Sequence, residues 1–428
     1  MADLTYQGVV KDTFVSDTVS STPVELIKNG LPLERTAAPA PIKVPRKSLN
    51  KTERPARFTK KLATKQLVFY SKHSPPAFTY DIEYDLPIKK PNELIIEVRY
   101  AGLNPADLQI INTYNSYFNK ERGIGREYSG VVLYVGENLK DQWKEGDEVC
   151  GLYFHQYGLG TLASAIQIDP SIDPLVKKPE NISWEAAGSW MFTFGTAWSL
   201  LQKAGVKEGM SVLVIGGSSS VGLMLMQLLK QVYKCDEIFT TCSGSAVELV
   251  KEHGAKIAIN YRFGDVPSNL KNVLKTGVHH EYINDEEIEI STNTKKFDLI
   301  IDCVGGTQIL RNAGSLLKSY MQGGKYFTIV GDQKADYTKD TYGMDNTNWS
   351  GVGRGVTGML WGLSYNKFWF YPTKDAAKWM PIGADLLNKG QIENVVDSVY
   401  PWKDFSKAKE KLEKGHARGK IVMEIEKF

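Results

Sequence analysis

The stretch Ser211–Gly222, which reads S-V-L-V-I-G-G-S-S-S-V-G, constrains the fold of this chain more than any other. The apolar run Val212–Ile215 predicts a buried strand, and the apolar residues after Gly222 predict a helix. A strand, a tight glycine-rich turn and a helix together open a dinucleotide-binding fold, because the turn and the helix N-terminus aim backbone N–H groups at a pyrophosphate. This stretch therefore predicts a nucleotide-binding type of α/β domain.

One position departs from the fingerprint G-x-G-x-x-G. The register places Gly217, Ser219 and Gly222 at its three glycine positions, so a serine replaces the middle glycine. That glycine normally lets the backbone approach the pyrophosphate closely. Two interpretations stay open: a shell kept only for packing, or a cofactor site that comprises Gly217, Ser218, Ser219, Ser220, Val221 and Gly222.

Strand and helix patterns alternate after this turn. Buried strands are predicted at 238–242, 257–261, 298–305 and 325–331, with a helix at 246–253. This alternation predicts a doubly wound parallel sheet with helices on both faces.

The chain before the turn has a different pattern. Short strands separated by Gly and Pro are predicted within 66–70, 93–100, 130–136, 147–154 and 164–169, which indicates a compact β domain. A helix is predicted to begin at Ser183 and to continue through the apolar residues up to Leu201. We expect an arm at 1–62, the β domain at 63–185, a nucleotide-binding-type domain at 186–375 with insertions at 276–296 and 332–372, and a segment at 376–428 that completes both domains.

The positive charge of the chain is concentrated at its start. Residues 1–65 hold 12 Lys/Arg and 6 Asp/Glu, whereas the remainder holds 40 and 43. The arm is either a solvated disordered segment or a surface for anionic lipid or an acidic partner. Nucleic acid is a poorer partner, because no aromatic residues alternate with the cations and the body is acidic. Four scattered cysteines without a C-x-x-C pair indicate a reducing compartment, and no membrane span or secretory signal is predicted.

Several motifs together resemble one enzyme superfamily. They are A-G-L-N-P-A-D (101–107), G-R-E-Y-S-G-V-V (125–132), G-D-E-V-C-G (146–151), the stretch Ser211–Gly222, D-L-I-I-D-C-V-G (298–305) and G-H-A-R-G-K-I-V (415–422). In this order they resemble the zinc-free, quinone-reductase-like branch of the medium-chain dehydrogenase/reductase superfamily. The resemblance implies a medium-chain reductase fold, in which a GroES-like β domain is joined to a Rossmann domain. It also implies a homodimer that forms through the Rossmann sheet.

The basic arm and an aromatic stretch go beyond that pattern. The aromatic residues within 332–372 are Trp349, Trp361, Tyr365, Phe368, Trp369, Phe370 and Tyr371. In these two features the chain resembles fungal proteins that bind the plasma-membrane proton ATPase and help to target it. The aromatic residues either fill the space between the domains or form an exposed belt suited to a lipid interface or a partner.

The expected cofactor is NADPH and no metal is expected. Strand 238–242 is followed by Ser243 rather than by the Asp or Glu that holds the ribose hydroxyls of NAD. The resemblance adds Tyr261, beside Arg262, near the 2′-phosphate and Gly305 to the cofactor site. Zinc members of the superfamily place Cys or His within the stretch that is Leu103–Asp107 here, and His-Glu at Arg126-Glu127. We therefore predict that no zinc is bound.

Catalytic candidates come from the resemblance alone. It nominates Asn104 and Asp107, with Tyr114 nearby, as residues that line the pocket. Asn104-Pro105 is equally typical of a turn and Asp107 of a helix cap. Two functions stay open: a cytoplasmic, peripherally membrane-associated protein that assists targeting of a proton ATPase, with residual NADPH binding, and an NADPH-dependent reductase of quinones or enones.

Overall fold

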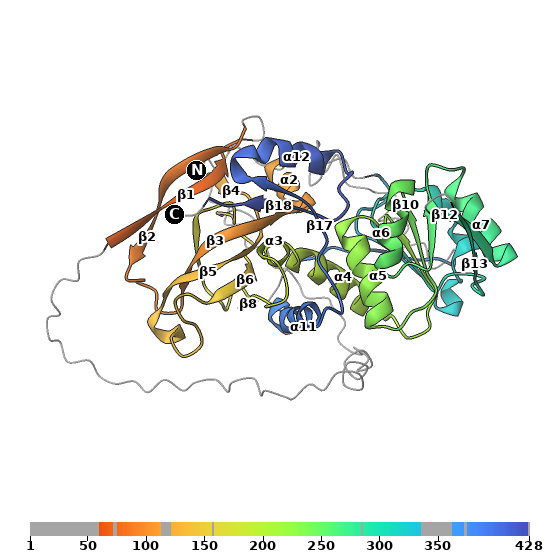
Figure 1. Ribbon diagram of the computed structural model, residues 1–428, viewed down its shortest axis with the longest axis horizontal. Helices are drawn as coiled ribbons and strands as arrows, with labels where there is room; N and C mark the ends of the chain where they lie inside the picture. The colour runs from red at the N-terminus through yellow and green to blue at the C-terminus, as the bar shows by residue number, and fades with distance from the viewer. Residues whose placement is uncertain are drawn as a thin grey trace, which may run out of the picture. The chain divides into compact units, whose positions relative to one another are not determined.

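The structure is a computed structural model that describes residues 60–71, 75–112, 121–155, 158–283, 286–334, 362–371 and 375–426 (Figure 1). Residues 1–59 of the predicted arm lie outside the described residues, as do Tyr114, Trp349 and Trp361. No helix within the described ranges has the length and apolar character needed to cross a membrane.

A mixed seven-stranded sheet forms the first domain. Strands β17, β18, β3, β5, β6 and β8 follow one another across it, and β7 pairs with β3. Their bounds are β3 Leu94–Leu103, β5 Glu127–Val135, β6 Glu148–Leu152, β7 Ala165–Ile168, β8 Leu175–Lys177, β17 Val396–Pro401 and β18 Lys420–Glu424. Strand β18, from the end of the chain, thus lies beside β3, which Figure 1 shows, and β17 pairs with the other edge of β18.

A smaller antiparallel sheet completes the core of this domain. It consists of β2 (Ala77–Leu86), β1 (Lys60–Phe69) and β4 (Arg122–Gly123). Apolar side chains of β1, β3, β5 and β18 pack into one buried cluster, which includes Phe69, Ile96, Tyr128 and Ile421. Helices α2 (Pro105–Asn112) and α12 (Phe405–Glu413) contribute Ile110 and Phe405 to that cluster.

The second domain contains a six-stranded parallel sheet. Its order is β11-β10-β9-β14-β15-β16, with bounds β9 Val212–Ile215, β10 Ile238–Cys242, β11 Ile257–Asn260, β14 Leu299–Asp302, β15 Lys325–Thr328 and β16 Ser364–Lys367. The order reverses between β9 and β14, which is the switch point where doubly wound sheets bind ligands at the carboxyl ends of their strands. The predicted α/β fold class is confirmed.

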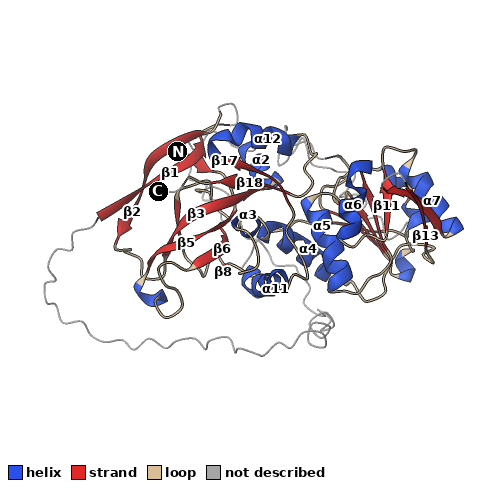
Figure 2. Ribbon diagram, viewed as in Figure 1, coloured by secondary structure: helices blue, strands red, loops and turns tan. Residues whose placement is uncertain are grey.

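Helices flank this sheet (Figure 2). They are α4 Met191–Ala204, α5 Ser220–Gln231, α6 Val247–Glu252, α7 Val266–Thr276, α8 Gln308–Arg311 and α9 Ala313–Leu316, while α11 (Ala376–Asn388) packs on α4 and β8. Apolar residues of β9, β10, β11 and β14 are buried against α7, α8 and α9 in a second core.

Two parts of the chain differ from the sequence prediction. The segment 332–372, expected to be an insertion, contains β16, the edge strand of the parallel sheet. The prediction of one continuous helix from Ser183 onward is wrong, because the chain forms two helices there, α3 (Trp184–Ala187) and α4. The chain turns at Gly188, whose carbonyl accepts from Gly102 N (2.9 Å) and whose Cα lies too close to the Tyr100 carbonyl for a side chain. The segment 276–296 holds a hairpin of β12 (Val278–Ile283) and β13 (Glu286–Ser291).

Candidate functional site

The glycine-rich turn after β9 is tied to the neighbouring strand β10. Gly216 has φ +82°, a left-handed conformation that favours glycine, and its N–H donates to Thr241 Oγ1 (3.0 Å). Gly217 N donates to the Thr241 carbonyl (3.0 Å), and a Cβ at Gly217 would lie 2.0 Å from Thr240 Oγ1. Close contact with β10 therefore requires glycine at 217.

Ser219 is the N-cap of α5. Its Oγ accepts from Gly222 N (3.1 Å) and donates to the Gly216 carbonyl (2.7 Å), and its φ is −71°. The side chain is thus bonded within the turn, in a backbone conformation that does not need glycine. A Cβ at Gly222 would lie 2.4 Å from the Gly216 carbonyl oxygen, so this glycine lets α5 pack on the turn.

The first turn of α5 keeps donors for an anion. The Ser219 hydroxyl accepts from Gly222 N, and the Ser219 carbonyl accepts from Leu223 N (2.9 Å). Within the described chain, the N–H groups of Ser220 and Val221 have no protein acceptor, as is usual at a helix N-terminus. Ser218, Ser220 and Val221 are half-buried. This arrangement fits a pyrophosphate at the carboxyl end of β9.

Ser243 and Tyr261 follow neighbouring strands and lie at the same sheet edge. Tyr261 N donates to the Cys242 carbonyl (3.0 Å), and Tyr261 is 48% exposed. The turn Ser243–Ser245 also receives Arg418, whose Nη1 donates to the Ser245 carbonyl (2.7 Å) and whose Nη2 donates to Ser245 Oγ.

Sequence reasoning missed Arg418 as a neighbour of this turn. No cation was found within Ser243–Val247, yet the structure supplies one from the motif G-H-A-R-G-K near the end of the chain. A guanidinium has five donors in a planar fork, which suits a phosphate. The only signal in the sequence is that arginine within the motif.

Gly305 closes the opposite side of the switch point, after β14. Its φ is +82°, and its N–H and that of Val304 donate to Asp302 Oδ1 (2.8 and 2.9 Å). A Cβ at Gly216 would lie 2.5 Å from Val304 Cγ2, so the two turns are in contact. Burial raises the pKa of Asp302 above its ordinary value, against the effect of these N–H groups.

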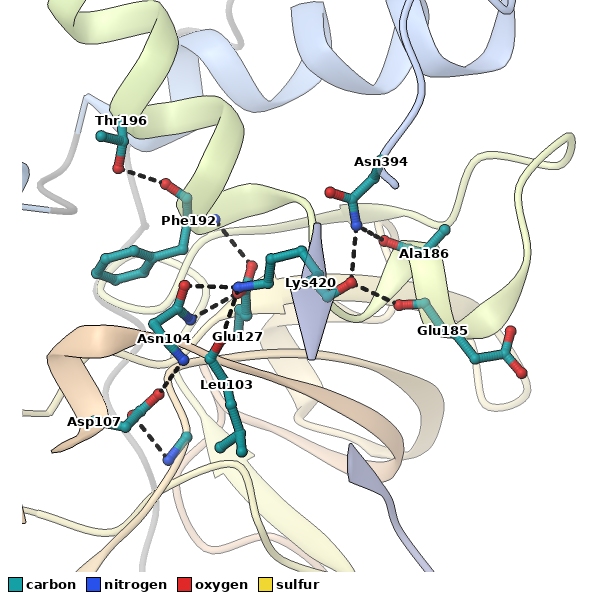
Figure 3. Close-up of polar contacts among 12 residues, drawn as sticks. Leu103, Asn104, Asp107, Glu127, Glu185, Ala186, Phe192, Thr196, Asn394 and Lys420 are labelled. Carbon is teal, nitrogen blue, oxygen red and sulfur yellow. Dashed lines mark hydrogen bonds and ion pairs between the residues drawn. The ribbon is translucent and has the colours of Figure 1, made fainter. Parts of the chain in front are cut away.

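Asn104 takes part in a buried polar network (Figure 3). Its Nδ2 donates to Glu127 Oε1 (2.8 Å), and its Oδ1 accepts from Lys420 Nζ (2.7 Å). Lys420 also donates to Glu127 Oε1 (2.8 Å) and to the Leu103 carbonyl (3.0 Å), so its three N–H groups are all used. The second oxygen of Glu127 accepts from Phe192 N (2.9 Å).

Asp107 is a backbone cap in this arrangement. Its two carboxylate oxygens accept from Asn104 N (2.9 Å) and Gly125 N (3.1 Å), and the side chain is buried. Burial raises the pKa of Asp107, and the Arg126 charge opposes this increase. Asn104 and Asp107 are therefore close together but occupied by contacts within the protein.

Comparisons with known proteins establish the family of the chain. The family model described as "Alcohol dehydrogenase GroES-like domain" matches residues 90–180, and "Zinc-binding dehydrogenase" matches 253–423. Protein AST2 of Saccharomyces cerevisiae is 37% identical over 412 residues, which cover 92% of this chain and 95% of that protein. The chain belongs to the medium-chain dehydrogenase/reductase superfamily.

Two further similarities are informative. Protein AST1 of Saccharomyces cerevisiae is 34% identical over 413 residues, covering 92% of this chain and 95% of that protein. The structure of the quinone oxidoreductase from Coxiella burnetii superimposes with a TM-score of 0.63 and 23% identity, covering 86% of this chain and all of that one. At that identity the structural likeness supports the superfamily fold alone, including the predicted GroES-like domain.

The donor set does not fit the zinc of other superfamily members. Where a ligand pair would stand, the Arg126 guanidinium is buried and donates to the carbonyls of Gly125 (2.6 Å) and Gly123 (3.1 Å). Glu127 is already paired with the Lys420 ammonium. In the described ranges no three His, Cys, Asp or Glu side chains cluster as a metal site would require.

The described part of the aromatic stretch alternates between buried and exposed side chains. Phe368 is buried, and Phe370 packs edge-on against Phe192 of α4, with ring centroids 5.2 Å apart. Trp369 and Tyr371 are 48% and 55% exposed. The described part of this stretch therefore contains both buried and exposed aromatic side chains, and the choice between the two interpretations stays a prediction.

Proposed function

We propose that this superfamily member is a peripheral membrane protein that assists the targeting of a plasma-membrane proton ATPase. The observation that carries the proposal is the extent of its likeness to the AST proteins. Residues 60–428 make up 369 of 428 positions, or about 86%, so a match over 92% of the chain extends into residues 1–59. The similarity to the AST proteins therefore includes part of the basic arm, whereas the resemblance to the reductases does not.

The exposed aromatics support contact with a lipid surface. Trp369 follows the buried Phe368, and Lys367 Nζ lies 4.3 Å from the centre of the Trp369 ring. A cation beside an interfacial tryptophan suits the headgroup region of an anionic membrane. Together with the arm this gives two signals, which stable peripheral binding usually needs.

Flotation with vesicles tests the membrane part of the proposal. We expect the full chain to bind vesicles rich in phosphatidylserine at low salt, and to be released at about 0.5 M salt. Removal of residues 1–59 should abolish binding, and the double variant Trp369→Ala/Tyr371→Ala should weaken it. Tyr80→Ala, which removes a 61% exposed aromatic from β2, is the matched control. A full chain that stays unbound at low salt contradicts the proposal.

Co-purification tests the partner. The full chain should be retained by detergent-solubilised plasma-membrane proton ATPase, and the variant without residues 1–59 should not. The targeting role is refuted if the full chain binds vesicles but the ATPase retains neither the full chain nor the shortened variant. The chain would then be a membrane-binding protein with another partner.

A second candidate function is an NADPH-dependent reductase of quinones or enones. Arg418 beside Ser243–Ser245 favours it, together with the donors of Ser220 and Val221. The turn Gly217–Gly222 would hold the pyrophosphate, and Ser243, Tyr261 and Arg418 the 2′-phosphate. When bound, NADPH supplies a hydride to an electron-poor acceptor. Asn104 and Asp107 would then position the pocket wall through their contacts with Glu127 and Gly125.

An NADPH titration tests this candidate. Binding should be saturable and should raise the melting temperature. Ser220→Asp should abolish it, because a carboxylate at the first helical position favours the helix but repels a phosphate. If millimolar NADPH neither binds nor shifts the melting temperature, the reductase function is excluded.

A further inference from the structure

Two adjacent residues on the segment that connects α11 to β17 are bonded to different domains. Glu393 is bonded through its backbone to Gln227 of α5, with Glu393 N to Gln227 Oε1 at 2.7 Å and Gln227 Nε2 to the Glu393 carbonyl at 3.0 Å. Asn394 Nδ2 donates to the Ala186 carbonyl (3.1 Å) and Ser189 Oγ (2.8 Å), beside α3 (Figure 3). Helix α3 packs on β3 and β5 of the first sheet, so residues 393–394 join α5 of the Rossmann domain to the first domain.

A histidine next to α6 holds the same segment. His253 is 6% exposed; its Nδ1 lies 2.6 Å from the Leu249 carbonyl oxygen and its Nε2 lies 2.5 Å from Glu393 Oε1. A carbonyl and a carboxylate both accept hydrogen bonds and donate none. A neutral imidazole has one N–H, whereas an imidazolium has two. Only the protonated ring satisfies both contacts.

Glu393 is the charged side chain bonded to this ring, and three lysines near it in sequence or in the fold have other partners. On α6, Lys251 is paired with Glu281 of β12 (3.1 Å). On α5, Lys230 is paired with Asp236 (2.7 Å) and Gln227 is neutral. Lys256, before β11, is paired with Glu237.

We propose that His253 and Glu393 form a pH-sensitive clamp, in which the protonated imidazole holds the segment 393–394 against the Rossmann domain. When the ring loses its Nε2 proton, the nitrogen lone pair faces the carboxylate and the contact is lost. The coupling between the two domains therefore depends on this proton and weakens when the ring loses it. This device does not depend on whether NADPH or a membrane is bound.

Glu393→Gln is the decisive variant. A glutamine amide can donate to the neutral Nε2 while Nδ1–H still donates to Leu249, so the contact persists without a charge. The Glu393 side chain is 68% exposed, so this change is tolerated by the fold. In hydrogen exchange of the full chain, after correction for intrinsic rates, the amides of Glu393 and Asn394 should exchange about fivefold faster at pH 8 than at pH 5.5 in the wild type. In Glu393→Gln they should exchange at equal rates.

Histidine NMR of the full chain gives an independent measurement. The His253 signal, assigned by its loss in His253→Asn, should show an imidazolium, with both ring nitrogens protonated, at pH 5.5 in the wild type. A neutral His253 at pH 5.5 in the folded wild type would overturn the proposal. Equal pH dependence of the exchange rates in the wild type and Glu393→Gln would overturn it as well.

Discussion

Arg418 and Ser245 are joined by two hydrogen bonds although 173 positions separate them, with Nη1 2.7 Å from the Ser245 carbonyl oxygen and Nη2 bonded to Ser245 Oγ. The backbone of Arg418 is fixed independently, since its N–H donates to Asp397 Oδ1 (2.9 Å). The guanidinium therefore lies at the carboxyl end of β10, where the proposed NADPH would place the 2′-phosphate that NADH lacks.

Replacement of Arg418 by methionine should reduce NADPH affinity selectively. Hydrogen bonds to a charged phosphate contribute about 1.5–3 kcal/mol, so the dissociation constant for NADPH should increase about 10- to 100-fold. The constant for NADH should change little. Calorimetric titration with both nucleotides measures this ratio.

Lys414→Met is the control for Arg418→Met, because it removes an exposed cation from the same region, where Lys414 pairs with Glu410 (2.6 Å). It should leave both affinities unchanged. Equal losses of NADPH and NADH binding in Arg418→Met would contradict a role for this side chain at the 2′-phosphate.

Ser219 should stabilise the turn without limiting the cofactor. Ser219→Ala removes the acceptor for Gly222 N and should cost about 1 kcal/mol, whereas Ser219→Gly should cost a few tenths. Because the hydroxyl is bonded inside the turn, Ser219→Gly should change NADPH affinity by less than about threefold. Urea denaturation and nucleotide titration measure the two effects. A gain in affinity above tenfold in Ser219→Gly would show that serine obstructs the phosphate.

Local patterns were sufficient for much of the fold. Strand β10 occupies the predicted residues 238–242, and Ser183 caps a helix as expected, with Oγ accepting from Ala186 N (3.2 Å). Strand β16 was missed because S-Y-N-K has only one large apolar residue, Tyr365, and no alternation. The periodicity of apolar residues predicts buried strands. An edge strand with few apolar residues, such as β16, therefore gives a weak signal.

The site was predictable only where its residues are adjacent in sequence. The turn Gly217–Gly222 follows from its own pattern. Asn104 and Lys420 are 316 positions apart, so no spacing rule relates them, and the buried pair of Lys420 with Glu127 emerges only when β18 lies beside β3. The contact of Arg418 with Ser245 was missed for the same reason.

The stability of the Rossmann domain should decrease in acid partly through Asp298. Burial alone would raise the pKa of Asp298, but Lys318 Nζ (2.6 Å) and the N–H and hydroxyl of Ser211 (both 3.0 Å) hold it below its ordinary value. A carboxyl whose pKa is lowered on folding stabilises the protein above its unfolded pKa, near 4, and this contribution is lost as the pH falls below that value.

Asp298→Asn tests this contribution. Between pH 5 and 3 its unfolding free energy should decrease less steeply than that of the wild type, when both are measured by urea denaturation. Asp141→Asn, which removes an exposed carboxylate, should keep the wild-type slope. If Asp298→Asn has that slope too, Asp298 is not a source of the acid sensitivity.

Lys420→Met should be strongly destabilising, because it leaves the Glu127 carboxylate buried without its cation. Lys420 and Glu127 are 2% and 1% exposed and 2.8 Å apart, and loss of one partner of such a pair costs about 3–5 kcal/mol. The double variant Lys420→Met/Glu127→Gln should recover part of this loss, since a neutral amide oxygen still accepts from Phe192 N or Asn104 Nδ2. Lys389→Met, from a half-exposed pair with Asp385, should cost less than about 1 kcal/mol. Unfolding free energies from urea denaturation complete the cycle, and a cost below about 1 kcal/mol for Lys420→Met would show that the buried pair does not hold β18 to β3 and β5.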